Sequence, residues 1–254
     1  MNAKMILTDL DHTLIRSDGS ISDHTKRILG ECQRRGVLVV IATARYWIGA
    51  ERYIEEILPD YEITTEGTLI HRRGEQIYSN IMKADNVNQI IKDLKAASPG
   101  AEIAVAAGRQ VFWNSLHISE SKKWYKAVFY DYSKPLSYST NAILAQLTDG
   151  DIAEEIADKN NCRLQSYRGE DWYAFLPKKS GKIVAICELA RMLNIDFGDI
   201  VSFGDDINDI EMLEICGVGV AVANAVDKVK SCADCVALSN DEDGVARWVE
   251  ENIL

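Results

Sequence analysis

The segment Met5-Ile6-Leu7-Thr8-Asp9-Leu10-Asp11-His12-Thr13 decides the fold of this chain. Its first four residues form a short, mostly apolar run that stops at Asp9. A short apolar run bounded by polar residues is typical of a buried strand. We therefore predict a strand over residues 5–8 that delivers Asp9 and Asp11 to a polar loop at its carboxyl end.

The residues that follow predict a strand–helix–strand unit with parallel strands. Ser22 and Gly36 stand where an N-cap and a C-terminal glycine would bound a helix. The run Val37–Ala42 is continuously apolar and rich in β-branched residues, as in the fully buried strand of a parallel sheet. Thr43-Ala44-Arg45 ends this strand, and a helical pattern continues to Leu58. The order of these elements predicts a right-handed crossover.

The rest of the core has the same alternating pattern. Residues 61–65 predict a third strand, and residues 69–70 and 76–78 flank a turn in a small hairpin. After Pro177 the predicted elements are a helix over 182–193, a strand over 200–203, a helix over 209–215, a strand over 218–222, a short strand at 235–238 and a final helix from Gly244.

The middle of the chain has a different pattern. It shows helical patterns over 87–97, 141–147 and 152–159 and strand patterns over 103–106, 110–113, 163–166 and 172–176. Such an order favours an α+β module. We therefore predict an α/β protein with a Rossmann-like parallel-sheet core over residues 1–82 and 178–254, with helices on both faces. An α+β cap domain over residues 83–177 is inserted into this core.

Composition limits the classes of partner. The chain has 254 residues, is 47% hydrophobic and has a formal net charge of −11. An acidic surface repels a phosphate backbone, so we expect no nucleic-acid partner. No apolar run approaches the roughly 20 residues of a membrane span, and residues 1–7 lack the apolar stretch of a signal peptide. We expect a soluble, cytoplasmic protein with no membrane partner.

The six cysteines are scattered and mostly stand in apolar surroundings, as reduced thiols do in a cytosolic protein. Cys232 and Cys235 have the spacing of a redox or zinc motif. No second cysteine pair or histidine pair accompanies them, which favours ordinary free thiols.

Polar clusters stand at the carboxyl ends of the predicted core strands or at the start of a helix. They are Asp9 and Asp11 after the first strand, Thr43 after the second, Lys182 at the start of a helix, and Asp205, Asn208 and Asp209 after the strand over 200–203. In an open parallel sheet, ligands bind at this edge. We therefore expect these side chains, far apart in sequence, to converge there.

These residue types indicate phosphoryl transfer. Four carboxylates would repel one another without a cation, and Mg²⁺, which prefers oxygen ligands, fits such a set. A lysine and a threonine hydroxyl can bind the remaining oxygens of a phosphoryl group. One carboxylate can act as the nucleophile through an aspartyl-phosphate, and a second can act as general acid and base.

Four segments resemble the four motifs of the haloacid dehalogenase (HAD) superfamily. They are Asp9-Leu10-Asp11-His12-Thr13-Leu14, Ile41-Ala42-Thr43-Ala44-Arg45, the helix-start Lys182, and Gly204-Asp205-Asp206-Ile207-Asn208-Asp209-Ile210-Glu211-Met212-Leu213. Residues 220–225 and 240–246 resemble the Cof-type members (subfamily IIB), and the position of the insert resembles their C2 cap. The resemblance covers the core nearly end to end.

The resemblance implies a role for each matching residue. Asp9 would attack phosphorus and ligate Mg²⁺, while Asp11 would act as general acid and base and ligate the metal through its backbone carbonyl. Thr43 and Lys182 would complete the catalytic residues and bind phosphoryl oxygens, and the further substrate-binding and metal-binding residues would be Arg45, Asn208, Asp205 and Asp209. Asp209 would support the metal's water ligands or Lys182. Because the dehalogenases of this superfamily lack the second aspartate, Asp11 indicates a phosphatase.

Two positions depart from the family pattern. Ala44 replaces a usual glycine, which is a small change. Glu66 stands where Cof-type members carry asparagine before Gly67. Its carboxylate would repel an anionic substrate, bind a cation or point to solvent.

Several residues keep two interpretations. The aromatic residues of the insert favour packing of a small module over a stacking pocket; they are Phe112, Trp113, Trp124, Tyr125, Phe129, Tyr130, Tyr132, Trp172 and Tyr173. Arg109, Lys122, Lys123 and Lys126 would recognise a second anionic group or be solvated. Asp206 would belong to the metal shell or cap a helix.

The sequence thus predicts an Mg²⁺-dependent phosphatase of small phosphorylated metabolites, with sugar phosphates as the first class, acting as a monomer or small homo-oligomer. One alternative is a sugar phosphomutase of the same superfamily. Another is a non-catalytic ligand-binding sensor, which would have no need of both a nucleophile and an acid.

Overall fold

The computed structural model describes residues 3–115, 127–167 and 169–254. Contacts within the chain divide it into two compact units. Unit 1 comprises Met1–Ala44, Ala50–Ile77 and Gly181–Leu254, and unit 2 comprises Arg45–Gly49 and Tyr78–Ser180. The domain boundaries at 82/83 and 177/178 stay a prediction.

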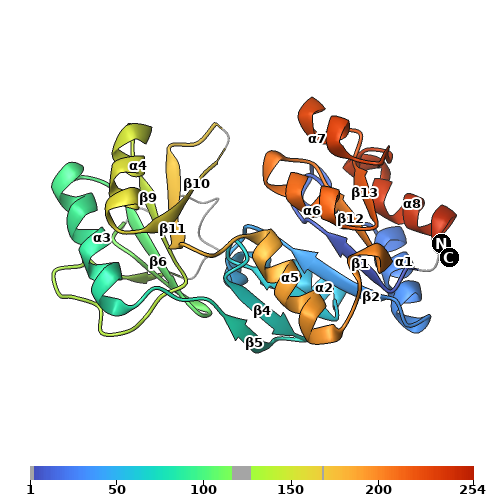
Figure 1. The fold of residues 1–254 in the computed structure, drawn as a ribbon, viewed down its shortest axis with the longest axis horizontal. Helices are drawn as coiled ribbons and strands as arrows, with labels where there is room; N and C mark the ends of the chain where they lie inside the picture. Colours follow the sequence, from blue (N-terminus) through green and yellow to red (C-terminus); the bar gives the residue numbers. More distant parts are fainter. Residues whose placement is uncertain (1–2, 116–126, 168) are drawn as a thin grey trace. The chain divides into compact units, whose positions relative to one another are not determined.

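Unit 1 is built on the larger sheet, whose strand order is β14-β13-β12-β1-β2-β3-β4-β5 (Figure 1). The strands are β1 (Met5–Thr8), β2 (Leu38–Ala42), β3 (Tyr61–Thr64), β4 (Leu69–Arg72), β5 (Glu75–Ser79), β12 (Ile200–Gly204), β13 (Val218–Ala221) and β14 (Cys235–Val236). Pairing is parallel from β14 to β3 and antiparallel between β3 and β4. The predicted parallel-sheet core is therefore confirmed, and the hairpin forms its antiparallel end.

Helices cover both faces of this sheet. They are α1 (Asp23–Arg34), α2 (Trp47–Ile57), α5 (Lys182–Leu193), α6 (Ile210–Ile215), α7 (Asp227–Cys232) and α8 (Gly244–Asn252). Ser202 donates its hydroxyl hydrogen bond to a carbonyl of α6, while the next residue, Phe203, packs its ring against Trp248 of α8. Because successive side chains of a strand point to opposite faces, α6 and α8 lie on opposite sides of the sheet.

Unit 2 is an α+β module with a sheet ordered β10-β11-β9-β6-β7-β8. Its strands are β6 (Ile103–Ala107), β7 (Gln110–Trp113), β8 (Val128–Phe129), β9 (Ala142–Gln146), β10 (Cys162–Ser166) and β11 (Trp172–Pro177). The helices α3 (Ala84–Ala97) and α4 (Gly150–Lys159) lie side by side and share one apolar cluster with the sheet (Figure 1). Alanines of the strands, with Trp113 and Trp172, form a second cluster.

The helix predicted over residues 141–147 is wrong, because residues 142–146 form β9. This strand pairs with β6 on one side and β11 on the other. Ala142, Ile143 and Ala145 are all buried there. A central strand buried on both faces loses the alternating pattern of a surface strand, and a short apolar run then cannot be told from a helix by periodicity.

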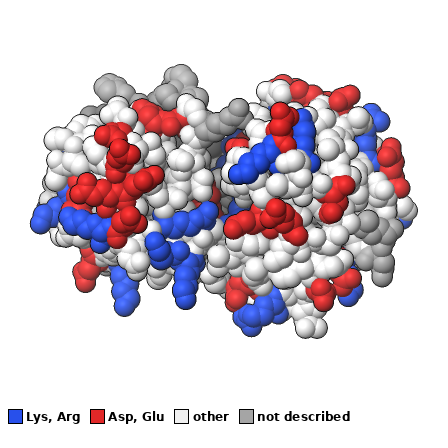
Figure 2. All heavy atoms as spheres, turned by 45° about the horizontal axis from the view of Figure 1, so that its top comes forward, with Lys and Arg blue, Asp and Glu red and all other residues white. Residues whose placement is uncertain are grey.

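The described cysteines are all free, including Cys232 and Cys235, which are half-buried. Within the described part of the chain, no helix is both long enough and apolar enough to cross a membrane. On the face drawn in Figure 2, acidic and basic side chains are interspersed. The absence of nucleic-acid partners stays a prediction.

Candidate active site

Asp9 stands at the carboxyl end of the central strand of unit 1. β1 pairs in parallel with β12 and with β2, so three strand ends meet at this edge. The Asp9 backbone N–H continues the ladder by donating to the Phe203 carbonyl at 3.0 Å. The residue is only 6% exposed, so the fold buries a carboxylate where polar loops begin. A buried carboxylate must be paired with a cation or metal, or take up a proton.

Lys182 supplies that pairing. It is the first residue of α5, and its Nζ lies 2.6 Å from Asp9 Oδ1 and 2.7 Å from Asp209 Oδ1. Its exposure is 4%, so little water reaches the three groups. Charge-assisted hydrogen bonds of this length are strong and directional. Lys182 therefore fixes the orientation of the Asp9 carboxylate.

The start of α5 is set by a close approach of two glycines. Gly181 precedes Lys182, and Gly67 lies so near it that a Cβ on Gly67 would collide with the Gly181 carbonyl. Gly67 also has a φ of +74°, which favours glycine. The loop after β3 therefore packs directly against the point where the lysine leaves the backbone.

Asp209 connects Lys182 to the loop after β12. Its Oδ1 accepts from Lys182, and its Oδ2 accepts from the backbone N–H groups of Asp205 at 3.1 Å and Asp206 at 3.3 Å. Asp209 is 0% exposed. Both of its oxygens are thus engaged in holding other residues of the site.

Gly204 leaves the space that the Asp209 side chain occupies. A Cβ on Gly204 would lie 2.5 Å from Asp209 Cβ and 2.8 Å from Asp209 Oδ2. Real side-chain carbons do not approach so closely, so either the loop or the carboxylate would have to move. The need for glycine here comes from packing, since its φ is not in the left-handed region.

We therefore expect Gly204→Ala to lower both stability and turnover. Overpacking costs about 1–3 kcal/mol, and displacement of Asp209 loosens Lys182. Thermal unfolding and phosphatase kinetics measure the two effects. Gly100→Ala is the matched control, because nothing lies within 4 Å of a Cβ at Gly100. Wild-type kinetics in Gly204→Ala would contradict the role given to this contact.

Asp205 follows Gly204 and is half-buried. Its Oδ1 accepts a hydrogen bond of 2.8 Å from the Thr13 hydroxyl. Thr13 is 1% exposed and ends the segment Asp9-Leu10-Asp11-His12-Thr13. From the sequence alone Thr13 is assigned no role, although a threonine that stands two residues after Asp11 in the same motif is a signal the sequence offers. Thr13 links the first and last motifs across 192 residues.

The site has an excess of negative charge. Burial raises the pKa of Asp9, and the Lys182 ammonium lowers it. The carboxylates of Asp209, Asp11 and Asp205 raise it further. Burial likewise raises the pKa of Asp205 to about 6, against the hydrogen bond from Thr13. Burial lowers the pKa of Lys182, but Asp209 and Asp9 outweigh it and the pKa is raised. A second cation would keep Asp9 and Asp205 ionised.

The donor set fits a hard divalent cation. One oxygen each from Asp9, Asp205 and Asp209 lie within 4.8 Å of one another. Asp11 is half-buried in the turn after β1 and close enough to Asp9 to act on its pKa. Carboxylate and carbonyl oxygens are the ligands Mg²⁺ prefers. Of the four predicted metal residues, the structure brings Asp9, Asp205 and Asp209 together and places Asp11 beside Asp9.

The structure places the three remaining predicted site residues in different parts of the fold. Thr43 is buried at the end of β2, where its N–H donates to the Ile63 carbonyl; α2 begins only at Trp47. Asn208 is half-buried in a short 3₁₀ helix, Ile207–Asp209, that Asp206 caps through its side chain. Arg45 belongs to unit 2, where its guanidinium donates to the Gly49 carbonyl.

Glu66 does not point to solvent. It is 1% exposed and has a φ of +54°, within a turn in which Thr65 and Gly67 also have positive φ. Asparagine adopts this conformation more readily than glutamate or threonine. The solvent-exposed alternative is therefore wrong, and this chain buries a carboxylate in a strained turn next to the start of α5.

In unit 2, packing accounts for several of the aromatic residues. Trp113 and Trp172 are buried edge to face with ring centroids 5.7 Å apart. Tyr132 is buried and its hydroxyl donates to the Phe112 carbonyl at 2.8 Å. The Arg109 guanidinium stacks over the Trp47 ring, with its central carbon 4.2 Å from the ring centroid. Lys122, Lys123, Trp124, Tyr125 and Lys126 lie outside the described residues.

In comparisons with known proteins, this chain is matched over nearly its whole length. The family model for haloacid dehalogenase-like hydrolases matches residues 6–249. The chain is 26% identical to the 5-amino-6-(5-phospho-D-ribitylamino)uracil phosphatase YitU of Bacillus subtilis (strain 168), covering 97% of this chain and 96% of that protein.

Solved structures show the same fold. A haloacid dehalogenase-like hydrolase from Bacteroides thetaiotaomicron superposes with a TM-score of 0.83 at 22% identity, covering 98% of this chain and 99% of that one. The subclass IIB sugar phosphatase BT4131 superposes with a TM-score of 0.82 at 21% identity over 98% of both chains. With the predicted Cof-type resemblance confirmed, the chain belongs to the haloacid dehalogenase-like hydrolase family.

Proposed function

We propose that this protein is an Mg²⁺-dependent phosphatase that hydrolyses small sugar and polyol phosphates through an aspartyl-phosphate on Asp9. It is a phosphoric monoester hydrolase of the family to which it belongs. The observation that carries the proposal is the buried Asp9 carboxylate, held at 2.6 Å by Lys182 beside Asp205 and Asp209. A carboxylate so fixed and so surrounded suits nucleophilic attack on a phosphoryl group.

The first half of the reaction would run through Asp9 and Asp11. An Asp9 oxygen attacks phosphorus as the bond from phosphorus to the substrate alcohol breaks. Asp11 donates a proton to the departing alkoxide. Lys182 and Thr43 would bind phosphoryl oxygens, and Asn208 would do so from the next motif. Arg45 stays a predicted contact of the substrate.

The second half returns the enzyme to its starting state. Asp11, now ionised, takes a proton from water, and the water oxygen attacks phosphorus. The acyl phosphate bond breaks, so inorganic phosphate leaves and Asp9 is again a free carboxylate. Positioning of the attacking and leaving groups, together with electrostatic stabilisation of the phosphoryl oxygens, accounts for almost all of the acceleration in phosphoryl transfer.

Asp9, Asp205 and the backbone carbonyl of Asp11 would hold Mg²⁺. The ion would supply positive charge to the phosphoryl oxygens and to the carboxylates around it. For Asp209 we propose the positioning role, because one of its oxygens contacts Lys182 and the other contacts two backbone N–H groups.

The relatives support the proposed substrate class. YitU is named for a substrate with phosphate on a ribityl chain, and it matches this chain over nearly its whole length. Sugar phosphates present the same group, a phosphate on an alkyl carbon flanked by hydroxyls. We further propose a cytoplasmic enzyme that acts as a monomer or small homo-oligomer.

The test is phosphate release from a panel of sugar phosphates, polyol phosphates, nucleotides and cofactors, each with kcat/KM. We expect turnover with Mg²⁺, its loss with EDTA, and the highest kcat/KM among sugar and polyol phosphates. Interconversion of sugar phosphate isomers without release of inorganic phosphate would identify a mutase instead. Tight binding without turnover of any phosphomonoester would identify a sensor.

A further inference from the structure

The segment after the catalytic turn is held by residues just before α8, which are called the tail of unit 1. Here the catalytic turn means residues Leu10–Ile15, and the tail means residues 239–243, which include a short 3₁₀ helix. Asp243 accepts two hydrogen bonds from Arg16, and Asp241 accepts from the Ser17 backbone and hydroxyl. The Arg16–Asp243 pair is partly buried, with Asp243 only 9% exposed.

Two asparagines extend these contacts into the turn itself. Asn224 Nδ2 donates to the His12 carbonyl at 2.7 Å, and Asn240 Nδ2 donates to the Ile15 carbonyl at 2.8 Å. The asparagines also bind each other, because the Asn240 backbone N–H donates to Asn224 Oδ1 at 2.9 Å. Asn240 is 4% exposed, whereas the Asn224 side chain lies at the surface.

The turn is tightly closed between these two points. The N–H groups of Leu14 and Ile15 both donate to the Leu10 carbonyl, at 3.0 and 2.8 Å. His12 has a φ of +56°, which is uncommon for a residue with a side chain. Asp11 lies between Leu10 and His12, so the orientation of these peptide planes determines where its side chain can reach.

We propose that Asn224 and Asn240 act as one positioning unit for Asp11. Asn224 holds the turn directly after Asp11, Asn240 holds its end, and the bond between them makes the two contacts interdependent. Neither side chain needs to touch the substrate. The inference rests on the proposed function, because it assigns the unit to the residue that protonates the leaving group.

The chemistry of the leaving group provides a specific readout. An alkoxide must be protonated as it departs, so hydrolysis of a hexose 6-phosphate depends on a well-placed Asp11. A p-nitrophenolate departs without that proton. Because kcat/KM covers only the steps up to departure of the alcohol, the later water attack does not affect it. A misplaced acid therefore lowers kcat/KM for the alkyl ester selectively, whereas general damage lowers both alike.

The experiment measures kcat/KM for both esters with Mg²⁺ in Asn224→Ala, Asn240→Ala, the double variant and Asp11→Asn. For Asn224→Ala we expect a loss of about 10–100-fold with the hexose phosphate and of no more than about threefold with p-nitrophenyl phosphate. Asp11→Asn is expected to show the same selectivity with a larger loss. If the asparagines act as a unit, the double variant is no worse than the more damaging single variant.

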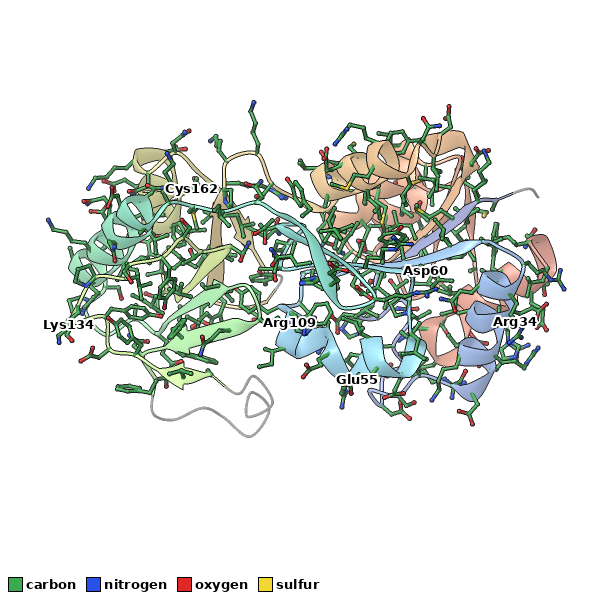
Figure 3. The ribbon with its side chains drawn as sticks, turned by 90° about the horizontal axis from the view of Figure 1, so that it is seen from below. Arg34, Glu55, Asp60, Arg109, Lys134 and Cys162 are labelled. Atoms are coloured by element: carbon green, nitrogen blue, oxygen red, sulfur yellow. The ribbon has the colours of Figure 1, made fainter. Side chains whose placement is uncertain are left out.

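Asp60→Asn serves as the control for stability. Asp60, labelled in Figure 3, directly precedes β3 and accepts hydrogen bonds from the Val39 N–H and from Gln33, outside the catalytic residues. This variant is expected to lower the melting temperature without changing the ratio of the two kcat/KM values. If Asn240→Ala fails to fold, Asn224→Ala alone tests the inference. Asn224 suits this purpose because its side chain is exposed.

Amide hydrogen exchange gives a second readout, on the metal-free protein. We expect faster exchange at residues 11–15 in Asn224→Ala, with the strands of the sheet unaffected. An equal loss with both esters, or an unchanged ratio and unchanged exchange, would overturn the positioning role while leaving the phosphatase intact. Absence of Mg²⁺-dependent phosphate release from the wild type would overturn the proposed function, and this inference with it.

Discussion

Asp9→Asn is expected to reduce phosphate release by about 10⁴-fold or more, a loss of the size seen when a covalent nucleophile is removed. An amide oxygen carries no negative charge and is a poor nucleophile, while the side chain keeps its size. Lys182 retains Asp209 as its partner at 2.7 Å, so the geometry of the site is preserved. The loss therefore reports chemistry and not folding.

The stability of Asp9→Asn is not expected to fall with its activity. Burial and three neighbouring carboxylates raise the pKa of Asp9 by more than the Lys182 ammonium lowers it, which means that the fold disfavours the charge of Asp9 in the metal-free protein. Asp9→Asn removes this charge, so its metal-free melting temperature is expected to equal or exceed that of the wild type. Kinetics on the best substrate of the panel and unfolding in EDTA measure the two effects.

Asp60→Asn is again the control, since it converts another buried carboxylate to an amide away from the catalytic residues. It should be less stable than the wild type with unchanged kcat. Turnover by Asp9→Asn within tenfold of the wild type would refute the aspartyl-phosphate mechanism.

The second large effect is expected for Lys182→Met. Methionine keeps the volume but removes the ammonium that lies 2.6 Å from Asp9 and 2.7 Å from Asp209. Breaking a buried ion pair by removing one partner costs about 3–5 kcal/mol, because the remaining charges have no compensation. We expect the metal-free variant to lose stability of this order, and kcat to fall by about 10²–10³-fold.

The double variant Lys182→Met/Asp209→Asn separates electrostatics from catalysis. It removes one of the two carboxylates that the lysine neutralised, so it should recover part of the lost stability. It should recover no activity, because the phosphoryl group still lacks its cationic contact. Wild-type stability in Lys182→Met, or restored turnover in the double variant, would contradict the role proposed for this lysine.

Much of the site could be predicted from local pattern. Apolar runs that stop at Asp9, Thr43 and Gly204 place their following residues at one edge of a parallel sheet, and parallel pairing of β12, β1 and β2 brings that edge together. Lys182 has no local pattern that marks it, and it is predicted only from its place in the order of the family motifs. Local pattern failed at residues 142–146, where burial on both faces removed the alternation that identifies a strand.

What the sequence by itself determined is therefore the set of chemical groups and the sheet edge that carries them. Only the tertiary structure decided how they are held: Lys182 bridges to Asp9 across 173 residues, Gly204 leaves room for Asp209, and Asn224 and Asn240 clamp the turn around Asp11. Glu66 likewise became a buried group rather than a solvated one. The physical reason is that periodicity records which face of an element is buried, whereas hydrogen bonds between distant loops depend on the packed positions of both partners.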